Sequence, residues 1–124
     1  MTPEPWQDGP AADAAAQVQD LTTLAAELLD QARTDLQRKA SRVVIRGPKQ
    51  RAVLIATLAG GGLAEHASPP AATLFVLQGR IRLSAGSERE WLVSAGQIVT
   101  IPPERHAVAA LDDSVFLLTV ALSG

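Results

Sequence analysis

From Leu21 onward, apolar residues recur every three or four positions, which is the spacing of an α-helix with one buried stripe. The residues of this stripe are Leu21, Leu24, Ala25, Leu28, Ala32 and Leu36. Asp20 precedes the stripe, and aspartate is a common helix N-cap. The pattern stops before residues 42–45. We therefore predict one helix over residues 20–40, with its stripe covering the outside of a following sheet.

After residue 40 the chain changes to short apolar runs separated by turn residues. The runs cover residues 42–46, 52–58, 73–77, 80–84, 91–93, 98–101, 107–110 and 115–122. Glycine, proline and aspartate separate them, as at 47–48, 60–62, 69–70, 102–103 and 112–113. Many short strands at this spacing are typical of an antiparallel sandwich or barrel. The sequence therefore predicts an all-β class with one N-terminal helix, and a barrel over residues 41–124.

Residues 1–19 show no hydrophobic periodicity and are expected to form a flexible N-terminal arm. The arm contains three prolines before Ala11 and a single aromatic residue, Trp6. Two interpretations of Trp6 stay open. The side chain docks on the surface of its own or a neighbouring subunit, or it is a partly exposed tryptophan without such a role.

Composition and charge narrow the class of protein. The 124 residues suit one domain, and 47% hydrophobic with 19% charged residues is the balance of a globular chain. A net charge of −2, without a basic run interleaved with aromatics, argues against a nucleic-acid partner. The absence of cysteine excludes disulfides and thiolate chemistry. With neither a signal-peptide pattern nor a spanning apolar stretch, we expect a cytoplasmic protein without membrane contact.

The order of glycines, histidines and prolines resembles the two motifs of the cupin superfamily. In the first motif, Gly60 is followed after five residues by His66, and the segment closes at Gly79. In the second, Gly96 is followed after five residues by Pro102 and then by His106. The resemblance covers about residues 42–122. It implies a double-stranded β-helix, or jelly-roll, barrel behind the N-terminal helix.

The chain departs from the cupin pattern at several positions, two of which are metal-ligand positions in the family. Ser68 stands where the family has its second histidine, and Ala71 or Ala72 where it has its glutamate. In the second motif, Glu104 replaces the glycine of Pro-x-Gly and Ala110 replaces the terminal asparagine. Two of the four ligands that the resemblance implies, His66 and His106, are present. They are the only histidines of the chain. We expect at most a weakly bound divalent metal, Zn, Mn, Fe or Ni, with Glu104 as a third ligand.

The same histidines are candidates for a ligand pocket inside the barrel. The predicted ligand-binding residues are His66, Ser68, Phe75, Leu77, Trp91 and His106. Such a set is mainly apolar with a few polar groups, which suits a small hydrophobic or aromatic molecule. The alternative is that these side chains fill the barrel as core, with the histidines bonded to each other, to a carbonyl or to water. Arg80 and Arg82 alternate with apolar neighbours and are expected on the solvated outer face.

Three functions stay open at this point. The first is a small-molecule-binding or sensing cupin that works as a homodimer. The alternative is a metal-dependent enzyme, of the oxygenase or isomerase type, acting on a small organic substrate. The third is a structural or partner-binding module. Fold analogy does not choose among them. Self-association is expected because strands near residues 74–77 and 116–120 are apolar on both faces.

Overall fold

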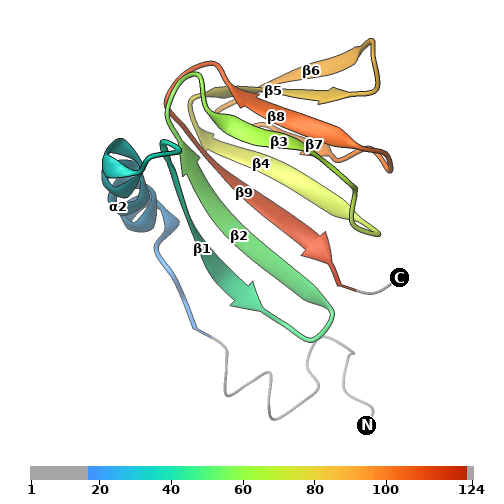
Figure 1. The fold of residues 1–124 in the computed structure, drawn as a ribbon. Helices are drawn as coiled ribbons and strands as arrows, with labels where there is room; N and C mark the ends of the chain where they lie inside the picture. The colour runs from blue at the N-terminus through green and yellow to red at the C-terminus, as the bar shows by residue number, and fades with distance from the viewer. Residues whose placement is uncertain (1–16, 123–124) are drawn as a thin grey trace, which may run out of the picture.

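In the part of the chain that the structure describes, nine strands form two facing sheets and one helix packs beside them (Figure 1). The computed structural model describes residues 17–122; the predicted role of Trp6 lies outside them. The larger sheet has the order β1-β2-β9-β4-β7, with bounds Lys39–Arg46, Gln50–Thr57, Ser114–Ala121, Ala72–Gln78 and Ile98–Thr100. The smaller sheet has the order β3-β8-β5-β6, with bounds Gly62–His66, His106–Ala110, Arg80–Ala85 and Arg89–Ser94. This architecture confirms the predicted all-β class with one N-terminal helix.

Strand β3 is the strand that the sequence did not predict. Its residues, Gly-Leu-Ala-Glu-His, contain no β-branched side chain and open with a glycine, so the run carries no strand signal of its own. Pairing with β8 makes it a strand. Gly62 has φ of +152°, and a Cβ there would lie 2.0 Å from the carbonyl oxygen of Val108. The close approach of β8 therefore requires glycine at this position.

Helix α2, Leu21–Thr34, is shorter than predicted but is capped as predicted. Oδ1 of Asp20 accepts hydrogen bonds from the amides of Thr22 and Thr23 at 3.0 and 3.2 Å. The helix ends where Asp35 adopts an extended conformation and its carboxylate accepts from the amide of Gln37. Residues 39 and 40 belong to β1 instead. Among the described residues, no helix is long and apolar enough to cross a membrane.

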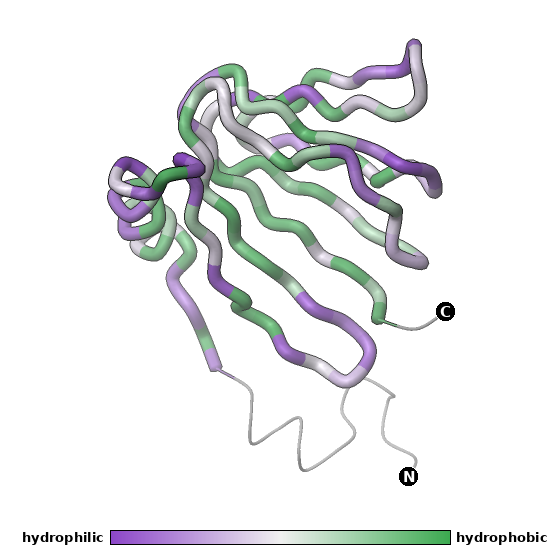
Figure 2. Tube along the Cα trace, viewed as in Figure 1, coloured by the Kyte–Doolittle hydropathy of each residue, from purple (hydrophilic) through white to green (hydrophobic). Residues whose placement is uncertain are grey.

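Two apolar clusters lie on opposite faces of the larger sheet. The inner cluster fills the space between the sheets and includes Leu74, Ile81, Leu83 and Phe116, none of them accessible to solvent. The outer cluster joins the helix to the other face of the same strands; its members are Leu24, Ala25, Leu28, Leu29, Ala32, Leu54, Ala56, Leu58 and Val115. Figure 2 shows the resulting run of apolar residues along β2, β9 and β4. Leu36, predicted in the stripe, is fully exposed because the helix has already ended.

We predict that Leu28→Ala lowers the free energy of unfolding by about 2–5 kcal/mol, because it leaves a cavity between helix and sheet. Leu36→Ala is the matched control, since this leucine is exposed and should change stability by no more than about 0.5 kcal/mol. Urea denaturation followed by circular dichroism measures both. Equal effects would mean that the helix does not pack on the sheet in solution.

Candidate functional site

The two histidines of the chain lie next to each other on neighbouring strands of the smaller sheet. His66 ends β3, His106 begins β8, and the two residues are directly opposite in the strand register. Their ring centroids are 4.3 Å apart, with the ring planes at 64° in an edge-to-face arrangement. His106 is buried, whereas His66 is partly exposed. Two segments 40 positions apart in the sequence thus bring their imidazoles into contact.

A β-bulge in β3 turns His66 to the inner face of the sheet. Leu63 pairs with Val108 and His66 pairs with His106, so three steps along β3 match two steps along β8. In a regular strand, residues three apart point to opposite faces. The extra residue cancels this alternation and places His66 on the same face as Leu63, which packs against the inner cluster.

Both imidazoles are held by the backbone in the same way. Nδ1 of His66 lies 2.8 Å from the carbonyl oxygen of Ala64, and Nδ1 of His106 lies 3.0 Å from that of Glu104. A carbonyl oxygen only accepts, so each Nδ1 carries the proton and donates it. In the neutral rings each Nε2 then keeps its lone pair. The pair therefore offers two acceptors of fixed orientation to a hydrogen-bond donor or a metal.

The histidines belong to a row of side chains that crosses all four strands of the smaller sheet. Register places His66 opposite His106, His106 opposite Ala85, and Ala85 opposite Arg89. Directly opposed residues share one face of a sheet. The next row contains Leu63, Val108, Leu83 and Trp91, all of which belong to the inner cluster or pack against it. The first row is therefore also directed toward the inside, and we call it the polar row.

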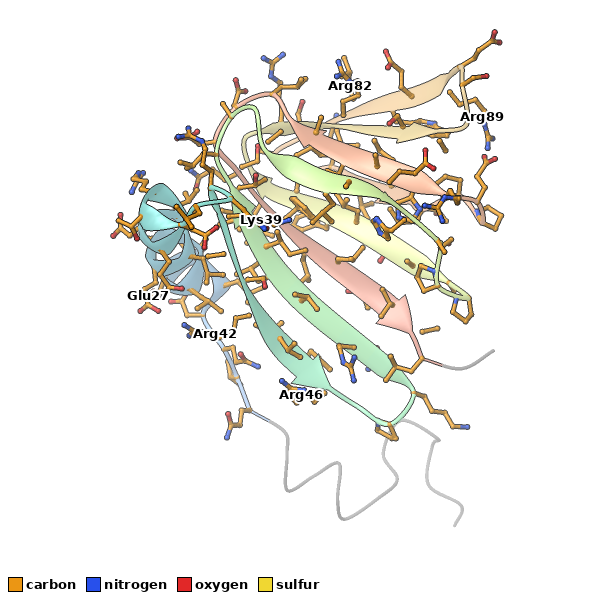
Figure 3. All side chains as sticks on the ribbon, in the orientation of Figure 1. Glu27, Lys39, Arg42, Arg46, Arg82 and Arg89 are labelled. Atoms are coloured by element: carbon orange, nitrogen blue, oxygen red, sulfur yellow. The ribbon has the colours of Figure 1, made fainter. Side chains whose placement is uncertain are left out.

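Arg89 ends the polar row and makes two further interactions. Its guanidinium forms an ion pair with the carboxylate of Glu104, in the loop before β8. Its Cζ lies 5.5 Å from the ring centroid of Trp91, within the range of a cation–π contact. Figure 3 places Arg89 at the outer end of the β5–β6 hairpin. Glu104 thus holds His106 through its carbonyl oxygen and Arg89 through its carboxylate.

Other charged groups near the histidines lie on the outer face or are neutralised there. Nε of Arg105 donates to the carboxylate of Glu65 at 2.9 Å, between the residues that precede the two histidines. Nε of Arg82 lies 3.8 Å from Oε2 of Glu90, and the Arg82 side chain projects from β5 away from the larger sheet (Figure 3). Arg80 pairs with Asp112 at 2.9 Å. This ion pair holds the pKa of the Asp112 carboxyl below its usual range. The outer position expected for Arg80 and Arg82 is confirmed.

Three residues predicted to line the pocket are placed elsewhere. Leu77 packs against the outer cluster under helix α2, so its assignment to the barrel interior was wrong. Phe75 alternates with the inward-facing Leu74 and Val76, and therefore also points to the outer face of the larger sheet. Ser68 donates its hydroxyl proton to the carbonyl of Pro69 at 2.9 Å in the β3–β4 loop. Of the predicted set, His66, His106 and Trp91 share the inner face of the smaller sheet.

Arg89 and Ala85 are site residues that the sequence analysis missed. Arg89 stands in a charged stretch, Glu88-Arg89-Glu90, and nothing in that stretch distinguishes an inward position from an outward one. The only sequence clue to the inward position of Arg89 was that residues two apart in a strand share a face, so that Arg89 shares the face of Trp91.

The donor set does not fit the four-ligand metal site that the resemblance implies. Among residues 17–122, no group of three or more histidine, aspartate or glutamate side chains could hold a metal. Glu104, the expected third ligand, pairs with Arg89 instead. The two imidazoles alone supply too few ligands to fill the coordination sphere of Zn, Mn, Fe or Ni.

A shallow hollow of about 420 Å³ lies beside the polar row, between the edge strands β6 and β7. Its walls are formed by Trp91, Leu92, Val93, Gln97, Ile98 and Val99. A second hollow of about 250 Å³, near the end of β9, contains none of the predicted site residues. The hollow at the β6 edge is therefore mainly apolar, and Trp91, which stands in the row next to the polar row, forms part of its wall.

Burial lowers the pKa of His106, and a positive charge on neighbouring His66 lowers it further. The folded chain therefore binds a proton at His106 less readily than the unfolded chain, whose histidines titrate near about 6.5. We predict that the free energy of unfolding is greatest above this pH and falls as the pH drops through the lowered pKa of the folded state.

The measurement is urea denaturation at pH values from 8 down to 5, comparing wild type with His106→Gln. The variant should lose part of the dependence on pH, whatever its stability at pH 8. An unchanged dependence would show that protonation of His106 does not oppose folding.

Solved structures of the same architecture come from several bacteria. A conserved protein of unknown function from Streptococcus pyogenes is 23% identical, with a TM-score of 0.69 over 88% of this chain and 89% of that one. A Thermus thermophilus protein is 19% identical, with a TM-score of 0.67 over 86% and 98%. The segment from the start of β1 to the end of β9, residues 39–121, is about two thirds of the chain, so both matches extend into positions before β1, where α2 lies.

An RmlC-like cupin from Desulfovibrio desulfuricans is 22% identical, with a TM-score of 0.64 over 73% of this chain and 88% of that one. No protein-family model and no curated protein matches the sequence. At these identities the likeness concerns the fold alone. The chain therefore has the fold of a small RmlC-like cupin, a two-sheet jelly roll with one helix packed on its outside.

Proposed function

We propose that the protein binds a small organic molecule at the inner face of its smaller sheet, with His66 and His106 as the polar contacts. The observation that carries this proposal is the matched orientation of the two rings. Each Nδ1 donates to a backbone carbonyl, which leaves a lone pair on each Nε2. The two residues are 40 positions apart in the sequence, but their rings are adjacent in space. Two rings oriented in this way are a preorganised pair of acceptors.

The surroundings favour a mainly apolar ligand. Trp91 and Leu63 stand in the row next to the polar row and are only partly buried, so part of their apolar surface remains accessible to solvent. The hollow beside Trp91 has largely aliphatic walls. Ligand sites commonly combine such walls with a few oriented polar groups.

The fold by itself does not select a ligand. The cupin fold is shared by KdgF from Halomonas and by the cupin domain of Cnp3 from Schizosaccharomyces pombe, at 19% and 12% identity. A metal-dependent enzyme has less support, because the described residues bring only two imidazoles together for a metal.

The proposal is tested by screening a library of small organic fragments against protein whose histidines are labelled with ¹⁵N. We expect the fragments that bind to shift the imidazole nitrogen signals of His66 and His106. The double variant His66→Ala/His106→Ala should bind them about tenfold more weakly, because two hydrogen bonds are lost. Glu65→Gln is the control, since this side chain lies on the outer face beside His66. Fragments that bind without affecting either imidazole would overturn the proposal.

We also propose that the protein forms a homodimer. Helix α2 packs on β1, β2 and β9, and its cluster reaches β4 at Leu77; the outer face of β7 has no cover from the described chain. Ile98 on that face is 65% exposed and lies opposite Phe75. A second copy is the simplest cover for such an apolar surface. Light scattering should give twice the chain mass of 13.0 kDa, and Ile98→Glu should shift it toward the monomer. A monomeric mass at high concentration would contradict the proposal.

A further inference from the structure

Arg89 is the one basic side chain among the described residues that stands in the polar row with the histidines. It is two strands from His106, and Ala85 is the residue between them. Strands lie about 4.8 Å apart, so the backbones of Arg89 and His106 are separated by about 10 Å. Ala85 is buried, with 2% of its surface accessible, and its methyl group places no long side chain between Arg89 and His106.

The guanidinium already binds a carboxylate, that of Glu104. The ion pair is well exposed, with 57% of the Arg89 side chain and 41% of the Glu104 side chain accessible. Exposed ion pairs of this kind contribute little to stability and exchange partners readily. The indole of Trp91 under the guanidinium fixes the arginine without using its hydrogen-bond donors. Arg89 is therefore positioned to bind a second carboxylate in place of the first.

We propose that Arg89 is the carboxylate-binding residue of this site, and that Glu104 is an internal competitor which a ligand's carboxylate displaces. This inference rests on the proposed function and gives the chemical class of its ligand as a small carboxylic acid with an apolar body. The carboxylate binds Arg89, and the apolar body lies against Trp91, whose ring adjoins the hollow between β6 and β7.

The backbone of Glu104 connects the two halves of the site. Its carbonyl oxygen accepts the Nδ1 proton of His106 and is only two bonds from the Cα that bears the competing side chain. When a ligand displaces the Glu104 carboxylate, the loop that orients His106 loses its tether to β6. Binding at Arg89 should therefore also be detected at the His106 ring.

The test is a titration of the ¹⁵N-labelled protein with benzoate and hexanoate, and with their neutral counterparts benzamide and hexanamide. We expect the acids to bind at least about tenfold more tightly than the amides, because the charged hydrogen bonds to arginine are lost with the charge. Arg89→Gln should remove this preference. Glu104→Gln should bind the acids about two- to fivefold more tightly than wild type, because the competing carboxylate is gone.

Glu90→Gln is the matched control. It removes a carboxylate from the same hairpin that pairs with Arg82 on the outer face, and it should leave acid binding unchanged. Circular dichroism melts of Arg89→Gln and Glu104→Gln separate a loss of binding from a loss of folding. A variant that is not folded is replaced by Arg89→Lys, which keeps the charge but loses the paired donors and should bind acids more weakly than wild type.

Each outcome decides the inference. Equal binding of acids and amides overturns it while leaving the proposed function standing, provided that the imidazole signals move. The inference is also overturned if neither wild type nor Glu104→Gln binds the acids. It is overturned as well if Glu104→Gln binds the acids no more tightly than wild type does. Acid binding that depends on Arg89 and Glu104 but leaves both imidazoles unaffected supports the carboxylate role and rejects the histidine pair as part of the site.

Discussion

The structure depends on the burial of both faces of the two adjoining strands β2 and β9. Leu54 and Ile55 are neighbours in β2 that point to opposite sides, one under the helix and the other between the sheets. Val115 and Phe116 repeat this arrangement in β9. A strand that is apolar on both faces needs a cover on each side. The smaller sheet provides one cover and helix α2 the other, which fixes the three layers and their order.

The smaller sheet combines a structural role with the candidate site. Its inner rows of aliphatic residues close the core, whereas its outermost inward-facing row carries His66, His106 and Arg89. The bulge in β3 is what makes this row possible, since it turns His66 inward without moving Leu63 out of the core. A local irregularity of one residue therefore adds His66 to the inward-facing row of the candidate site while Leu63 stays in the core.

The polar row also differs from the cupin metal site that the motifs imply. The two imidazoles stand without the second histidine and the glutamate of the family motif. Glu104, at the glycine position of the second motif, forms an ion pair with Arg89. The same positions of the fold thus carry acceptors at one end and a guanidinium at the other. This arrangement is the basis of the proposed recognition of an organic molecule, and it provides fewer ligands than the metal site that the motifs imply.

The sequence by itself determined the class of fold, the helix and most strands, because periodicity and turn residues are local properties of the chain. It also identified both histidines through the spacing of Gly60, Gly96 and Pro102. It could not place Phe75 and Leu77, since a strand that is apolar on both faces does not reveal which face is inside. It missed β3 because the run Gly-Leu-Ala-Glu-His carries no strand signal, and it missed the role of Arg89 because the charged stretch around this residue does not reveal which face is inside. Pairing with β8 and the bulge decided these positions, and both are contacts between segments that are distant in sequence.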